Sequence, residues 1–189
     1  MATRVGNRIT LSPRELPGEW YDPRPDLPFE LPPMMSPSGY PVTATELGPL
    51  FSGAAIDQEL GRLRRHRIPK PVRDAYAHWR PTPMFRAERL ERALDTPAKL
   101  FYKFEGGSPC GSYESNTAIP QAFFVRAGGF RRIITGGAGG IWVAAIGYAA
   151  RFFDVACRVY SVRSPDAGGV GQAAARLWDI DLVPSPSEA

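Results

Sequence analysis

"RRIITGGAGGIWVAAIGYAARFFDVACRVYSV", residues 131–162, decides the fold of this chain. A β-branched run at 131–135 is followed by glycines, then by a helical stretch, then by a second apolar run at 157–162. The spacing i, i+3, i+4, i+7 that marks one face of a helix is followed by Trp142, Ala145, Ile146, Ala149 and Phe153. Strand, helix and strand in this order predict two parallel strands joined by a right-handed crossover.

The same alternation continues on both sides of this stretch. "KLFYKFE" at 99–105 reads as a preceding strand, and "IDLVP" at 180–184 as a following one, with helices between. We therefore expect an α/β fold with a small four-stranded parallel sheet and helices on both faces. Ligands in such sheets bind beyond the carboxyl ends of the strands, which here are the loops 106–117, 135–141 and 163–170.

The N-terminal part of the chain differs in composition and in hydrophobic pattern. Residues 1–50 hold many prolines, which block helix and sheet, so this segment should be an extended arm. Its isolated aromatics, Trp20, Tyr21, Phe29 and Tyr40, indicate that the arm packs on another surface. Helical spacing marks 51–80, and the α/β domain follows at 81–189.

Composition and charge exclude several classes of function. The net charge of +4 includes one dense basic cluster, "GRLRRHRIPK", which we interpret as a solvated helix face, so no nucleic-acid partner is expected. The start of the chain lacks an apolar signal core and the longest apolar run is too short to cross a bilayer, which predicts a soluble cytoplasmic protein with no membrane partner. The two cysteines and two histidines form no cluster with metal-ligand spacing, so reduced thiols and no metal site are expected.

Several long segments resemble a known family in order along the chain. "PGEWYDPRPDLPFELPP", "SPCGSYESNTAIPQAFF" and "RLWDIDLVPSPS" are similar to segments in the N-terminal part of a tryptophan synthase beta chain of the second, longer type. The resemblance runs almost from end to end of the chain. It implies the fold of the type II pyridoxal phosphate enzymes, in a truncated form.

Three departures from the family fall on its chemistry. Where the family has Ser, His, Lys, Pro, Asn, Thr, this chain has residues 112–117, with Glu114 in place of the lysine that forms the Schiff base. A carboxylate cannot form an imine. The glutamate proton donor of the family is replaced by Thr135 or Gly136, depending on a one-residue gap. The half of the family that cradles the cofactor phosphate would follow Ala189, so the resemblance implies no conventional use of pyridoxal phosphate and we expect no cofactor.

The loop around Glu114 supplies candidate catalytic residues. If it is partly desolvated beside Tyr113, Glu114 could have a raised pKa and act with Tyr113 as a general acid or base. The alternative is a solvated loop carboxylate without a role. Ser112 and Asn116 could orient a polar ligand, or could cap the helix that begins near residue 117. Cys110 fits a small packing residue better than a nucleophile, because no base is visible beside it.

The glycine-rich stretch 136–140 is a candidate anion site. Its backbone N–H groups at a helix N-terminus would attract a carboxylate or phosphate. The same glycines could instead permit a tight turn and close helix packing. The candidate ligand-binding residues here are Gly136, Gly137, Ala138, Gly139 and Gly140.

These features leave competing functional interpretations. The first is a cofactor-independent cyclase, isomerase or lyase that acts by proton transfer on an aromatic, indole-like or terpenoid-like intermediate of specialised metabolism. The second is a non-catalytic pseudoenzyme that binds or regulates a full-length beta-type chain or another pathway enzyme. A weaker third is a fragmentary gene product without a role. Loss of the second domain would expose an apolar face, so we expect a homodimer or higher oligomer and a cleft, between subunits or beneath the arm, for an anionic or aromatic ligand.

Overall fold

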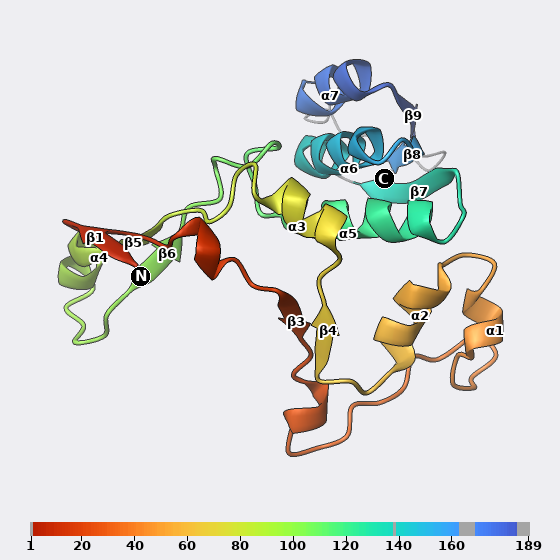
Figure 1. Ribbon diagram of the computed structural model, residues 1–189, viewed down its shortest axis with the longest axis horizontal. Coiled ribbons are helices and arrows are strands. Elements are labelled where there is room, and N and C mark those ends of the chain that lie inside the picture. The colour runs from red at the N-terminus through yellow and green to blue at the C-terminus, as the bar shows by residue number, and fades with distance from the viewer. Residues whose placement is uncertain (1, 138, 163–168, 185–189) are drawn as a thin grey trace.

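A three-stranded parallel sheet lies at the C-terminal end of the computed structural model, which describes residues 2–137, 139–162 and 169–184 (Figure 1). Its strands are β7 (Arg132–Gly137), β8 (Ala156–Ser161) and β9 (Ile180–Pro184), in that order. Helices α6 (Gly140–Phe152) and α7 (Val170–Trp178) connect them, as expected for right-handed crossovers. The strand–helix–strand prediction for 131–162 is therefore confirmed.

The helices of this region form one packed layer. Helix α5 (Glu114–Ala127) packs against α6, α6 packs against α7, and α3 (Lys70–Tyr76) contacts α5. The sheet residues that belong to the same buried core as these helices are Ile133, Cys157, Val159 and Ile180. Their neighbours on the opposite face are exposed: Ile134 keeps 60% and Tyr160 41% of its surface accessible. Within the described part of the chain, helices thus cover one face of the sheet, where the sequence led us to expect both.

The expected fourth strand of this sheet lies elsewhere. Residues 99–105 contain β6 (Phe101–Lys103), which pairs antiparallel with β5 (Met84–Arg86). A strand inside a parallel sheet is buried on both faces, whereas Phe101 and Tyr102 stay about half exposed. Tyr102 stacks on Phe85 across the strands, with ring centroids 5.4 Å apart. The short α4 (Glu88–Ala93) brings β5 and β6 together, so this partner close in sequence is the one that β6 joins.

The N-terminal arm contains short strands between its prolines. β1 (Thr3–Val5) and β2 (Arg8–Thr10) form a hairpin that extends the β5–β6 sheet. β3 (Glu19–Tyr21) pairs with β4 (Arg65–Arg67), so the basic cluster near residue 65 includes a strand and is not a helix face. Two 3-10 turns lie at Pro13–Glu15 and Arg24–Asp26, and the helices α1 (Ala44–Leu47) and α2 (Gly53–Leu60) follow. No helix among the described residues is both long and apolar enough to span a membrane.

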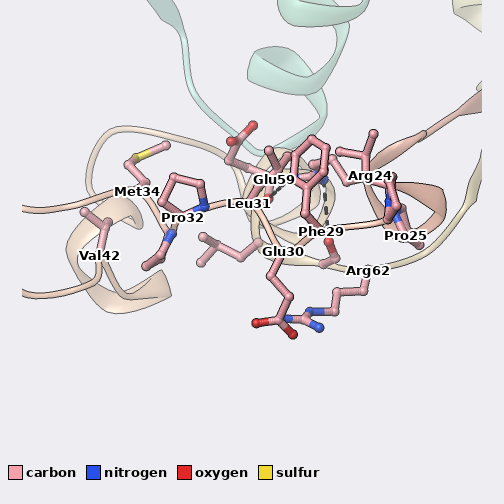
Figure 2. A pocket seen from close by; sticks show the side chains of 15 residues that line it. Arg24, Pro25, Phe29, Glu30, Leu31, Pro32, Met34, Val42, Glu59 and Arg62 are labelled. Carbon is pink, nitrogen blue, oxygen red and sulfur yellow. Dashed lines mark hydrogen bonds between the residues drawn. The ribbon is translucent and has the colours of Figure 1, made fainter.

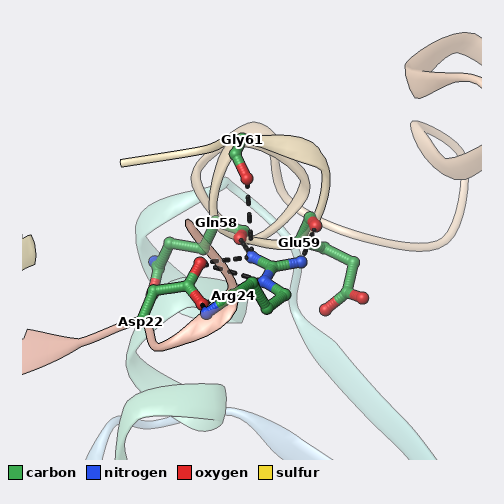
Figure 3. Close-up of polar contacts among 5 residues, drawn as sticks. All are labelled: Asp22, Arg24, Gln58, Glu59 and Gly61. Carbon is green, nitrogen blue, oxygen red and sulfur yellow. Dashed lines mark hydrogen bonds and ion pairs between the residues drawn. The ribbon is translucent and has the colours of Figure 1, made fainter. Parts of the chain in front are cut away.

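Arg24 fastens the arm to the end of α2. Its guanidinium donates to the backbone carbonyls of Gln58 at 2.7 Å and Glu59 at 2.6 Å, and it pairs with the carboxylate of Asp22 (Figure 3). The last carbonyls of a helix have no partner within the helix, so a cation placed there satisfies them and complements the helix dipole. The aromatic ring of Trp20, on β3, lies 6.3 Å from that of Phe124 on α5. The prediction that the arm packs on another surface agrees with this contact for Trp20, whereas Tyr21, Phe29 and Tyr40 stay 55%, 61% and 73% exposed.

Candidate functional site

Glu114 is the first residue of α5 and is partly withdrawn from water. Its Oε2 atom is buried and has no hydrogen-bond partner among the described residues, while its backbone N–H donates to Ser112 Oγ at 3.4 Å. Tyr113, in contrast, is 68% exposed. No hydrogen bond joins the Tyr113 and Glu114 side chains in the described part of the chain. The structure therefore offers Glu114 as a protected carboxyl group, but it does not couple Tyr113 to it.

Asn116 is engaged in a network that holds the start of α5. Its side-chain oxygen accepts from Trp79 Nε1 at 3.3 Å, and its side-chain nitrogen donates to Glu105 Oε2 at 3.2 Å. Its backbone carbonyl accepts from the hydroxyl of Tyr76 at 2.5 Å, and burial raises the pKa of that hydroxyl to about 12. Thr82 Oγ1 donates to the other carboxylate oxygen of Glu105. This geometry explains Asn116 as a tie between segments; a role in orienting a ligand stays a prediction.

The loop before α5 is shaped by its own hydroxyl groups. The Ser112 backbone N–H donates to Ser108 Oγ at 2.9 Å, and Ser108 Oγ in turn donates to the Ser112 carbonyl at 2.6 Å. Cys110 Sγ lies 2.8 Å from Oγ of the fully buried Ser115. Gly111 has a φ of +73°, which a side chain would strain. Cys110 also packs against the hydrophobic core, which agrees with its interpretation as a packing residue.

The glycine-rich loop joins β7 to α6, and Ala138 lies outside the described residues. A Cβ on Gly140 would lie 2.5 Å from the backbone nitrogen of Gly171 on α7, so a side chain here would force the two helices apart. A Cβ on Gly137 would meet the ring of Trp142 at 3.0 Å. Close packing thus accounts for these two glycines. Gly136 and Gly139 meet no such obstacle, and their binding of an anion stays a prediction.

No lysine lies at the position where the resemblance places the Schiff-base lysine of the family. The chain has Lys70, Lys99 and Lys103, none of them on α5. Lys70 Nζ forms an ion pair with Asp74 at 2.7 Å, and Lys103 Nζ donates to the carbonyl of Thr82 from within β6, where burial lowers its pKa. Glu114, at the position of the Schiff-base lysine, offers no amine for a covalent bond to pyridoxal phosphate. Nor do the described residues include a group of three or more metal-ligating side chains.

Two large hollows lie on the arm side of the molecule. One, of about 830 Å³, is bounded by residues 24–34 of the arm and the end of α2, with Phe29, Leu31 and Met34 along it (Figure 2). The other, of about 820 Å³, lies between α1, α2, α5 and the β7 strand. Neither is lined by Glu114 or by the glycines of the β7–α6 loop.

Sequence reasoning expected a cleft beneath the arm but did not name the residues that line the second hollow. It includes Phe51, Phe124, Phe130 and Ile134, of which Phe124 lies on α5 and Ile134 on the exposed side of β7. The signal available in the sequence was that α5 and β7 carry more apolar residues than are needed to bury one helix face and one sheet face.

Comparison with known proteins shows a close and nearly complete match of this chain. It is 40% identical over 182 residues to tryptophan synthase beta chain 2 of Methanosarcina acetivorans, covering 95% of this chain and 41% of the relative. It is 42% identical over 185 residues to the same-named protein of Aeropyrum pernix, covering 96% and 41%. The tryptophan synthase beta chain of Pseudothermotoga lettingae is 40% identical over 183 residues, covering 96% and 43%.

Other comparisons add little. No family model matches the chain. A fungal L-serine ammonia-lyase from Rhizomucor miehei superimposes with a TM-score of 0.43 at 25% identity, covering 57% of this chain and 33% of the lyase. The curated relatives decide the matter, and the sequence resemblance is confirmed: this is a tryptophan synthase beta chain-like protein, spanning about two fifths of the length of the relatives it matches.

Proposed function

We propose that this chain works as a non-catalytic binding partner of a beta-type chain. The observation that carries the proposal is the uncovered face of the parallel sheet, where Ile134 and Tyr160 keep 60% and 41% of their surface exposed. The Arg158–Asp181 ion pair, at 2.5 Å, lies on the same face. Exposed apolar side chains beside charged groups are typical of an interaction site. Glu114, by contrast, does not line either large hollow, as an enclosed catalytic pocket built around it would require.

The relatives indicate why the partner should be a beta-type chain. Each is more than twice as long as the region it shares with this chain, because the match covers only 41% to 43% of it. We propose that part of this additional chain packs on the corresponding sheet face. A beta-type chain thus has surface suited to cover β7 and β8, and a second copy of this chain, as in the predicted homo-oligomer, is the competing occupant.

The experiment is a mixing test with purified proteins. This chain, alone and with the beta-type chain of the same organism, is analysed by size-exclusion chromatography with light scattering at micromolar concentration. We expect a mixed complex that Ile134→Glu abolishes and Val5→Glu, at an apolar residue of β1 that is 73% exposed, leaves intact. Separate elution of the two proteins contradicts the proposal, and a homodimer that Ile134→Glu dissociates assigns the face to a second copy.

A second candidate function rests on the buried Oε2 atom of Glu114. A carboxyl group shielded from water can act as a general acid or base, which fits a cofactor-independent cyclase, isomerase or lyase for an aromatic, indole-like or terpenoid-like substrate. Mass spectrometry of small molecules that co-purify with the protein would supply the substrate to assay. Glu114→Gln should then abolish turnover while Glu19→Gln, on the exposed strand β3, leaves it unchanged; equal activity of both variants removes this candidate.

A further inference from the structure

A long apolar groove opens beside the first strand of the parallel sheet. It is the hollow of about 820 Å³ between α1, α2, α5 and residues 132–135 of β7, hereafter the β7 groove. Its apolar lining includes Trp20, Met34, Phe51, Ile56, Phe124 and Phe130. Phe51 and Ile134 keep 52% and 60% of their surface exposed. A hollow of this size and lining can take up several apolar side chains.

One wall of the groove is a free strand edge. β7 pairs with β8 and with no other strand among the described residues. In a parallel sheet the N–H and C=O groups of one residue point to one neighbouring strand, and those of the next residue point to the opposite side. The groups of β7 that point away from β8 have no backbone partner within the described ranges. Such an open row of donors and acceptors is a template for an added strand, and a neighbouring apolar hollow then receives its alternate side chains.

The concave shape of the β7 groove favours an extended peptide segment over a second copy of this chain. A second copy that paired through its own β7 would form an isologous interface, in which the same patch faces itself. Each copy would then present a groove walled by α2 and α5, and two hollows facing one another leave apolar space unfilled. A single extended segment, which has no walls of its own, can enter the groove and reach the strand edge.

The positive charge of Arg132 indicates that the docked segment carries an acidic residue. Arg132 lines the groove at the first position of β7, is exposed, and forms no ion pair with any described residue. A carboxylate on the incoming segment next to Arg132 would supply the missing partner.

We infer that the β7 groove docks an extended segment of another polypeptide, with apolar side chains at alternate positions and an acidic residue beside Arg132, which adds to the sheet as a fourth strand. The inference rests on the proposed function in that it adds the edge of β7 and the groove beside it to the contact that the proposed function places on the sheet face. The segment's backbone bonds to the free edge of β7, and its apolar side chains enter the groove between α2 and α5.

A model peptide tests the backbone part of this inference. The probe is acetyl-Asp-Val-Thr-Val-Thr-Val-Thr-amide, titrated to about 1 mM, a range in which weak single-strand docking is measurable, against the ¹⁵N-labelled protein by NMR. Two controls carry N-methyl groups, one on every valine and one on every threonine. We expect shifts at residues 132–136, and loss of about tenfold in affinity for one methylated peptide only, since only alternate N–H groups face β7. Absence of binding, or equal loss with both controls, overturns the inference.

Charge reversal tests the orientation of the segment. Arg132→Glu should weaken the peptide about fivefold, as expected for a solvent-exposed ion pair, and replacing the peptide's aspartate with lysine should restore the affinity. Arg151→Glu, at an exposed arginine of α6 that does not line the groove, is the matched control. Equal effects of the two substitutions, or failure of the swapped peptide to restore binding, contradict the acidic position.

Competition separates this inference from the proposed function. If the beta-type chain binds and the saturating peptide does not displace it, the groove is not the contact and the inference fails while the proposed function stands. If the peptide binds as expected and the beta-type chain does not bind at all, the proposed function fails and the groove keeps its assignment as a strand-docking site.

Discussion

Replacing Arg24 with alanine should loosen the arm from α2 and destabilise the fold. The substitution removes donors to the carbonyls of Gln58 and Glu59, at 2.7 and 2.6 Å, and leaves the Asp22 carboxylate without its ion pair. A hydrogen bond from a charged donor contributes about 1.5–3 kcal/mol, and partial exposure of Arg24 places two such bonds together at about 2–3 kcal/mol of unfolding free energy. A cation at a helix C-terminus adds a favourable dipole interaction to the same contact.

Urea unfolding followed by tryptophan fluorescence measures this loss, and hydrogen exchange of the α2 amides locates it. The matched control is Arg65→Ala, whose ion pair with Glu19 spans 3.4 Å between side chains that are 67% and 50% exposed, so that it should cost less than about 1 kcal/mol. If Arg24→Ala is no more destabilising than Arg65→Ala, or if exchange in α2 is unchanged, Arg24 does not anchor the arm.

Two further outcomes follow from the packing of the core. Gly147→Ala should destabilise the protein by about 1–3 kcal/mol, because the added Cβ would lie 2.2 Å from Cδ1 and 2.9 Å from Cγ1 of Ile180, and 3.0 Å from Cβ of Trp178. Gly53→Ala, where nothing lies within 4 Å of the added Cβ, should be neutral or stabilising. Thermal unfolding of the two variants measures the difference. Burial raises the pKa of the Cys157 thiol to about 11 from its usual value of 9.0, so the thiol ionises first in the unfolded chain and the free energy of unfolding should fall as the pH rises between these values. Cys157→Ala should flatten that fall in urea titrations from pH 8 to 11.

The sequence predicted the parts of the fold whose partners lie close along the chain. Residues 131–162 contain a complete strand–helix–strand unit, so periodicity alone placed β7, α6 and β8. The segment 99–105 failed because a short apolar run looks the same in a parallel and an antiparallel sheet, and the choice depended on β5, which periodicity did not distinguish. Covering of the sheet could not be predicted either, because which face a helix packs on follows from the order of strands in space.

In the candidate site, too, the sequence predicted some features and not others. Glu114 was found because a carboxylate replaces a lysine at a defined position, and the structure adds that its Oε2 atom is buried. The contacts of Asn116 with Trp79 and Glu105 were not predictable, since these residues lie 37 and 11 positions away and nothing in their types marks them as partners.

These contacts explain why the start of α5 keeps its shape without the lysine that reacts in the family. The start of α5 is fixed by Asn116, through Trp79, Tyr76 and Glu105, and none of these bonds involves the side chain at position 114. Position 114 contributes one backbone bond to Ser112 Oγ, which any residue but proline can make. Chemistry at this position can therefore change while the loop and helix keep their shape. The two proposals therefore concern surfaces away from position 114, namely the exposed sheet face and the β7 groove.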